Sequence, residues 1–263
     1  SEHKVGDKII FPAAGFIEII QACCTEVNPE QQFQIEHLCI LESLELSQEE
    51  AINLKITLQQ AIGNFYSLKI NSIKEDEVLQ HLSTDIIFKP LVYKNSDKVA
   101  ELAQAISKET HYSACRISNL NYGNGFQGIQ KIHHNESVFE AIIELPDNIN
   151  IADYIIHPTL LDACLQTILA PIYLKNDATY VPFSISQYKF YKAPKTSKLK
   201  SKVEVYDFDK TKLVCNLWIY EADDLCVEAV GVEFRVIHQA KSEASADNLF
   251  YELESTKIPI QNS

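Results

Sequence analysis

The stretch that decides the fold is His157-Pro158-Thr159-Leu160-Leu161-Asp162-Ala163-Cys164-Leu165-Gln166. Proline suits the first position of a helix, and most of the residues after Pro158 are apolar, so the stretch predicts a buried helix that ends near Leu169. A helix that is apolar on most sides must be surrounded, and a curved sheet can surround it. Asp162 and Gln166 are polar exceptions. They are four residues apart, so they lie on the same face of the helix.

A carboxylate at position 162 needs an explanation, because burying a charge is costly unless the group is paired or neutral. Burial disfavours the charged form and raises the pKa of an acid, which suits a general acid near neutral pH. Gln166 can donate a hydrogen bond to Asp162 from one turn further on. The alternative is a structural carboxylate satisfied by backbone donors, and the spacing alone leaves both interpretations open.

The same plan occurs earlier in the chain, where Pro12 opens an apolar helical stretch at 12–27. Four strand-like runs follow this first helix, at 33–47, 51–62, 64–73 and 78–89. Four more follow the second helix, at 181–192, 199–208, 211–221 and 225–237, and two precede it, at 126–134 and 137–145. The repeat predicts an α+β fold with two antiparallel sheets, each wrapped around a central helix.

The repeat also divides the chain. We expect a first half at 1–90, a linker at 91–111, a second half at 112–238 and a polar, loosely ordered tail at 239–263. A further helix is predicted at about 98–118. Two strands precede the second central helix and almost nothing precedes the first, so the repeat predicts that one or more N-terminal strands of the first half are missing.

Composition disfavours several classes of function. The formal net charge is −13, which disfavours nucleic-acid binding. No apolar run reaches the roughly 20 residues that span a bilayer, so we expect no membrane segment. Seven cysteines occur without a C-x-x-C pair, which indicates a reducing, cytoplasmic setting and neither a disulfide framework nor a zinc site.

One basic segment departs from the acidic trend. It holds six lysines within a short stretch: Lys189, Lys192, Lys195, Lys198, Lys200 and Lys202. The segment is either a solvated loop and strand edge or a docking patch for an acidic partner.

Two further motifs accompany the stretch around Asp162. The first runs from His3 to Pro12, nine residues apart, ahead of the first helix. The second is Tyr122-Gly123-Asn124-Gly125-Phe126-Gln127-Gly128. In their order and spacing, the three motifs resemble those of the dehydratase domains of modular polyketide synthases, which carry H-x-x-x-G-x-x-x-x-P, Y-G-P and H-P-x-x-x-D-x-x-x-Q/H. The similarity runs from His3 to about Val236, and it includes Val181-Pro182-Phe183-Ser184.

The resemblance implies a double-hotdog fold and the removal of water from a β-hydroxyacyl thioester. The substrate would be carried on the phosphopantetheine arm of an acyl carrier protein. His3 would be the base and Asp162 the acid, with no bound cofactor and no metal. The supporting and pocket residues would be Gln166, Tyr122, Gly123, Phe126, Pro12, His157 and Pro158. The implied partners are the carrier protein, neighbouring synthase domains and, in many relatives, a second copy of the domain.

The sequence departs from the family pattern at two positions. Asp7 stands where the first motif has glycine, with Gly6 one residue earlier, and Asn124 stands where the second motif has proline. Two alternatives therefore stay beside dehydration. The same fold can shift a double bond or close a pyran ring, and a non-catalytic domain can hold an acyl chain or a carrier protein. An intact Asp162 with Gln166 favours dehydration, because double-bond shifting needs the histidine but not the acid.

Overall fold

The computed structural model describes residues 2–47, 51–75, 77–93, 102–146 and 148–237. The first half contains helix α1 (Ala13–Val27) and strands β3 (Phe33–Ile40), β4 (Asn53–Gln60), β5 (Phe65–Lys74) and β6 (Glu77–Phe88). The strand predicted at 33–47 therefore ends at Ile40. Pro12 caps α1 with an extended backbone, as expected for a proline at a helix start.

The second half repeats this plan. Its helix α3 (Pro158–Gln166) ends three residues before the predicted boundary, and a short helix α4 (Leu169–Tyr173) follows it. Strands β9 (Ile129–His134) and β10 (Val138–Glu144) precede α3. Strands β11 (Tyr180–Phe190), β12 (Lys198–Phe208), β13 (Lys212–Glu221) and β14 (Asp224–Val236) come after α4. The predicted C-terminal tail, 239–263, lies outside the described residues.

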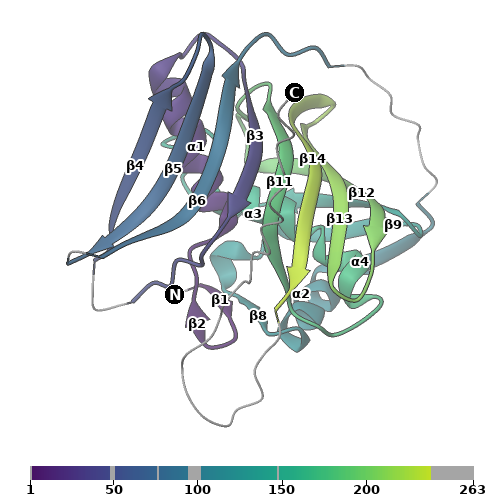
Figure 1. The fold of residues 1–263 in the computed structure, drawn as a ribbon. Coiled ribbons are helices and arrows are strands. Elements are labelled where there is room, and N and C mark those ends of the chain that lie inside the picture. Colours follow the sequence, from purple (N-terminus) through teal and green to yellow (C-terminus); the bar gives the residue numbers. More distant parts are fainter. Residues whose placement is uncertain (1, 48–50, 76, 94–101, 147, 238–263) are drawn as a thin grey trace, which may run out of the picture.

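The strands of the two halves join into one antiparallel sheet, whereas the sequence analysis predicted two sheets. Its order is β4-β5-β6-β3-β11-β14-β13-β12-β10-β9-β7. The junction is the pairing of β3 with β11, where Phe33 lies opposite Phe190 and their rings stack 5.0 Å apart. The four strands nearest the junction on either side follow mirrored orders, β3-β6-β5-β4 and β11-β14-β13-β12, which confirms the repeat of four strands after each central helix. Figure 1 shows α1 against the β3–β6 part and α3 against the part that begins at β11.

The helix predicted at 98–118 is only partly correct. Gln104–Ser107 forms strand β7, which pairs with β9 at one edge of the sheet, and helix α2 (Lys108–Ile117) begins after it. Ser107 caps α2, because its hydroxyl accepts a hydrogen bond from the backbone N–H of Thr110. The predicted linker at 91–111 thus holds a strand and the first turn of a helix. The division into two halves at these boundaries stays a prediction.

A second, three-stranded sheet includes two short strands ahead of α1, where the sequence indicated no strand. It consists of β1 (His3–Val5), β2 (Lys8–Ile9) and β8 (Leu120–Tyr122), in the order β2-β1-β8. β1 and β2 are joined by Gly6 and Asp7, and Gly6 has a φ of 60°. Glycine adopts this conformation without strain. The turn therefore forms with glycine at position 6 and aspartate at position 7.

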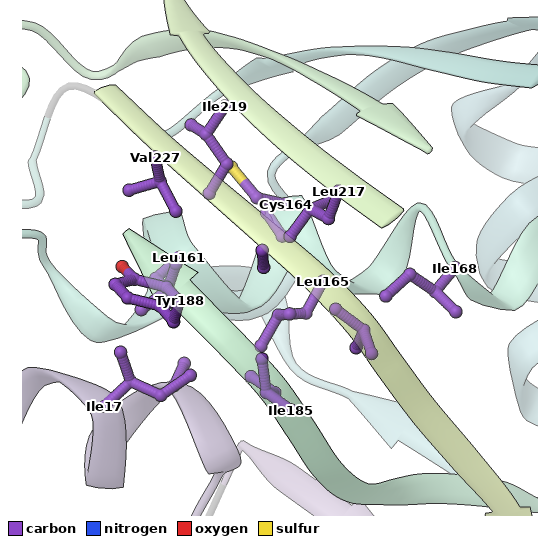
Figure 2. Close-up of a cluster of buried hydrophobic side chains, with 14 of the residues drawn as sticks. Ile17, Leu161, Cys164, Leu165, Ile168, Ile185, Tyr188, Leu217, Ile219 and Val227 are labelled. Atoms are coloured by element: carbon purple, nitrogen blue, oxygen red, sulfur yellow. The ribbon is translucent and has the colours of Figure 1, made fainter. Parts of the chain in front are cut away.

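The core surrounds α3 (Figure 2). Leu161, Cys164 and Leu165 are buried against apolar side chains of the sheet. The sheet residues labelled in Figure 2 come from β11, β13 and β14, and they are Ile185, Tyr188, Leu217, Ile219 and Val227. Ile17 of α1 reaches the same cluster from the first half. Full burial of such a side chain stabilises the fold by about 1.5–3 kcal/mol. The packing holds α3, and with it Asp162, in one position.

Candidate active site

His3 reaches the second half through strand pairing. β1 pairs with β8 in a register that places His3 opposite Tyr122. The imidazole lies 5.5 Å from the Tyr122 ring and 5.3 Å from the Phe126 ring, measured between ring centroids. These two aromatic rings enclose the histidine on the side of the second half.

A backbone contact decides which nitrogen of His3 is free. Nδ1 lies 2.9 Å from the carbonyl oxygen of Ile10. A carbonyl oxygen only accepts hydrogen bonds, so Nδ1 carries the hydrogen. In the neutral ring, Nε2 then holds a lone pair, and this is the state that a general base requires.

Asp162 faces that nitrogen. Oδ1 of Asp162 lies 3.8 Å from Nε2 of His3, which is longer than a hydrogen bond. The two groups come from α3 and β1, and therefore from different halves of the molecule. The imidazole and the carboxyl group consequently face each other across the junction of the halves.

Burial sets the protonation of Asp162. The residue is only 6% exposed, and desolvation raises the pKa of its carboxyl group. His3 and the amide of Gln166 both favour the charged form and partly oppose this rise. The amide Nε2 of Gln166 donates to Oδ2 of Asp162 at 2.7 Å, so the pairing predicted from the spacing of four is present. A raised pKa is what an acid needs in order to hold a proton nearer to neutral pH.

The structure brings five of the predicted site residues into one cluster: His3, Asp162, Gln166, Tyr122 and Phe126. Burial raises the pKa of the Tyr122 phenol well above its usual value, and the nearby Asp162 contributes. The backbone carbonyl of Phe126 accepts a hydrogen bond from Gln166 Nε2 at 2.9 Å. Tyr122 and Phe126 therefore both border the space around the acid.

The other four predicted residues shape the backbone around this cluster. Pro12 begins α1, and Pro158 occupies the first turn of α3. His157 caps α3, with Nδ1 accepting from the backbone N–H of Thr159. Gly123 donates its N–H to the backbone carbonyl of Glu2 at 2.6 Å. The turn at Asn124 is also closed, because the N–H of Phe126 donates to the Gly123 carbonyl.

Two contributing residues were missed by the sequence analysis. Tyr112 of α2 donates its hydroxyl hydrogen to Oε1 of Gln166 at 2.9 Å. Glu18 of α1 accepts from the backbone N–H groups of Ile155 and Ile156, at 2.7 and 2.9 Å, just ahead of α3. Glu18 could have been noticed in the sequence as a charged residue inside the apolar helical stretch 12–27.

A small apolar cavity lies near the site, where the halves meet. Ala13 and Ile17 of α1, Leu165 of α3 and Ile185 of β11 contribute to its lining. Leu165 is three residues after Asp162 and so belongs to a neighbouring position on the helix. The free space of the cavity is about that of a single water molecule, so it is a packing gap in the core.

The lysine-rich segment is largely engaged by the protein's own side chains. Lys189, Lys192 and Lys198 form ion pairs with acidic side chains at 2.6–2.8 Å. Lys200 and Lys202 lie over the rings of Tyr220 and Trp218. Within the described ranges, the structure holds no group of three His, Cys, Asp or Glu side chains arranged for a metal ion. It also holds no helix long and apolar enough to cross a bilayer in that part of the chain.

Known structures share this fold. The dehydratase domain from the CurK module of curacin polyketide synthase superposes with a TM-score of 0.81 at 23% identity, over 90% of this chain and 87% of that one. The dehydratase domain of RzxB from Pseudomonas fluorescens gives a TM-score of 0.82 at 18% identity, over 89% and 88%. The fold is a double hotdog, in which a histidine and a buried aspartate face each other.

The sequence comparisons give the family. Residues 94–244, more than half of the chain, match the family model described as polyketide synthase dehydratase N-terminal domain, and residues 1–73 match the polyketide synthase dehydratase domain. The chain belongs to the polyketide synthase dehydratase family, and it is a dehydratase domain. A highly reducing polyketide synthase of Aspergillus fumigatus, sphB, is 23% identical over 71% of this chain, which spans 8% of that relative's length. One of the phenolphthiocerol/phthiocerol polyketide synthase subunits of Mycobacterium tuberculosis is 21% identical over 99% of this chain and 15% of its own length.

Proposed function

We propose that His3 and Asp162 together remove water from a β-hydroxyacyl thioester. Nε2 of His3 takes the α-proton, and the electron pair of that C–H bond forms the α,β double bond. Asp162 gives a proton to the β-hydroxyl, so the C–O bond breaks and water leaves. The step ends with a protonated His3 and an ionised Asp162, which stabilise each other at short range.

One observation carries this proposal. The lone pair of His3 Nε2 and the buried carboxyl of Asp162 face each other at 3.8 Å from opposite halves. Double-bond shifting needs a base alone, so a buried acid with a raised pKa favours the loss of a hydroxyl group. Two solved variants of the CurK dehydratase are described as inactive, one with a histidine changed to phenylalanine and one with an aspartate changed to asparagine.

The surroundings supply the other needs of the reaction. Tyr122, whose ring centroid lies 5.5 Å from that of His3, is the candidate donor to the β-hydroxyl. Negative charge develops on the thioester carbonyl as the α-proton leaves, and the N-terminal amides of α1 are the candidate donors to it. No cofactor takes part in this scheme, and the phosphopantetheine arm belongs to the carrier.

The same proposal includes the partners and the setting. The substrate arrives on an acyl carrier protein, and the domain works beside other synthase domains, with a homodimer as the assembly. A cytoplasmic location agrees with seven cysteines that are all free thiols. We also propose that the chain divides into a first half at 1–90, a linker at 91–111, a second half at 112–238 and a tail at 239–263.

Product analysis tests the function against its alternatives. The domain is incubated with a β-hydroxyacyl chain on its carrier, and the bound product is examined by mass spectrometry and NMR. We expect the loss of one water molecule and an alkene conjugated to the thioester. An unchanged mass with a shifted alkene, or a new pyran ring, would indicate the other chemistries of this fold. An unaltered substrate with a folded domain would indicate a binding module.

A further inference from the structure

A chain of hydrogen bonds runs from the backbone of β9 to the acid. The N–H of Ile129 lies 3.0 Å from the hydroxyl oxygen of Tyr112. That hydroxyl lies 2.9 Å from Oε1 of Gln166, whose Nε2 lies 2.7 Å from Oδ2 of Asp162. Tyr112, Gln166 and Asp162 are all buried, so water does not compete for these groups.

The first link has only one possible direction. A backbone N–H can only donate, so the Tyr112 oxygen accepts from Ile129. The single hydroxyl hydrogen of Tyr112 must then go to an acceptor. Oε1 of Gln166 lies at 2.9 Å, whereas the carbonyl oxygen of Phe126 lies at 3.4 Å. The hydroxyl therefore donates to Gln166.

The orientation of the Gln166 amide follows. The carbonyl oxygen of Phe126 only accepts, and it lies 2.9 Å from Nε2 of the amide. A flipped amide would place Oε1 against that carbonyl, and two acceptors repel each other. One hydrogen of Nε2 thus goes to Phe126 and the other to Oδ2 of Asp162. The Tyr112 hydroxyl and the Phe126 carbonyl together determine this orientation.

We infer that Tyr112 is a positioning residue that, through Gln166, helps to keep the catalytic proton on one oxygen of Asp162. Because Gln166 always donates to Oδ2, the proton of the neutral acid resides on Oδ1. Oδ1 is the oxygen that faces His3, at 3.8 Å from Nε2, on the side where the substrate is attacked. This inference rests on the proposed function, because it takes Asp162 as the acid.

Removal of the Tyr112 hydroxyl leaves Oε1 of Gln166 without its donor, so that the Phe126 carbonyl alone holds the amide. An amide that is held less firmly and is less polarised donates more weakly to Oδ2, so the charged form of the carboxyl loses support and the proton is less strictly kept on Oδ1. The pKa of Asp162 then rises further while proton delivery slows. The titratable groups that surround Asp162 in the structure are His3 on β1, Tyr122 on β8, Tyr112 and Cys115 on α2, and Cys164 on α3.

Helix α1 of the first half, together with Tyr188 of β11, supplies a matched control. Tyr188 is buried and donates its hydroxyl to Oε1 of Gln21 at 2.9 Å, the same distance as in the Tyr112–Gln166 pair. Four residues before Gln21 stands Ile17, where the second half has Asp162. Tyr188→Phe thus removes an equivalent hydrogen bond that leads to no acid.

The experiment compares the wild type with Tyr112→Phe and Tyr188→Phe. Aspartate labelled with ¹³C at Cγ reports the pKa of Asp162 by NMR, and the signal is assigned through Asp162→Asn. Turnover of the carrier-bound substrate gives kcat and KM. For Tyr112→Phe we expect a higher pKa of Asp162 and a kcat about tenfold lower, because one hydrogen bond is worth about that factor. KM should change by less than about twofold, since the substrate is not contacted.

Tyr188→Phe should leave the pKa and kcat as in the wild type. An unchanged pKa in Tyr112→Phe overturns the inference, even if kcat falls, because a structural defect alone would do that. An equal rise in Tyr188→Phe also overturns it. If Tyr112→Phe does not fold, Gln166→Met replaces it, because this variant removes the amide itself. An unchanged pKa of Asp162 in Gln166→Met would then overturn the inference. The NMR titration needs no turnover, so a domain without dehydratase activity would refute the proposed function separately.

Discussion

Nδ1 of His3 donates a hydrogen bond to the backbone carbonyl of Ile10 at 2.9 Å, and this contact directs the other ring nitrogen at Asp162. Ile10 follows β2, so the hairpin of β1 and β2 both carries the proposed base and selects its tautomer. The hairpin in turn pairs with β8 of the second half. The proposed catalytic geometry therefore depends on a small sheet that is separate from the large one.

Loss of the imidazole should remove activity without unfolding the domain. For His3→Ala we predict a kcat about 10²- to 10⁴-fold lower, the usual contribution of a positioned general base. His3 belongs to a three-residue strand outside the large sheet, so the melting temperature should change little. His37→Ala is the control, because that side chain is 75% exposed on β3. Comparable losses in the two variants would contradict the role of His3.

Asp162→Asn should be inactive and yet more stable than the wild type at neutral pH. The pKa of Asp162 is raised in the folded state above its value in the unfolded chain. Ionisation therefore favours unfolding as the pH rises from the ordinary aspartate range through the folded pKa. Urea unfolding at several pH values measures this effect. The stability difference between the two proteins should be small in acid and grow toward neutral pH, and a constant difference would argue against a burial-shifted acid.

Glu18 should stabilise the segment that leads into α3. Glu18→Ala leaves the N–H groups of Ile155 and Ile156 without their acceptor, and Ile156 is buried. We predict a loss of about 2–4 kcal/mol in the free energy of unfolding. Glu18→Gln should also destabilise, because one of its two side-chain atoms can no longer accept. Glu26→Ala, an exposed position on the same helix, should have little effect.

His157 should act as a helix cap and not as a catalytic group. His157→Ala should cost about 1 kcal/mol of stability, while His157→Asn should retain most of it, because asparagine is a good N-cap. Turnover of both variants should stay near that of the wild type. Burial lowers the pKa of His157, so its contribution is present above the ordinary histidine pKa and is lost as the pH falls through the lowered value. A large loss of kcat with intact stability would give His157 a role in the reaction.

The sequence predicted those features of the site that depend on local spacing. Asp162 and Gln166 were placed on one face by their spacing of four, and the structure confirms their hydrogen bond. His3 came from the resemblance alone, since its approach to Asp162 depends on the register of β1 with β8, some 120 residues apart in sequence. Long-range register is set by tertiary packing, which local patterns do not contain.

The errors have similar causes. The sequence analysis included the short edge strand β7 in the helix that follows it. Four residues are too few for an alternating hydrophobic pattern that would distinguish a strand from a helix. The sequence analysis predicted two sheets because local patterns do not show the pairing of β3 with β11, which links segments from different copies of the repeat. Tyr112 was missed because a buried tyrosine in an amphipathic helix is usually a packing residue, and only its hydroxyl contacts distinguish it.

The most direct test of the His3–Asp162 assignment is the mass of the carrier-bound β-hydroxyacyl chain after a single turnover. The measurement is made side by side with the wild type, His3→Ala and Asp162→Asn, each shown to be folded by circular dichroism. The account predicts that the wild type removes one water molecule and that each variant leaves the substrate unchanged over the same time. Loss of water at the wild-type rate in either variant, or no loss in the wild type, would contradict it.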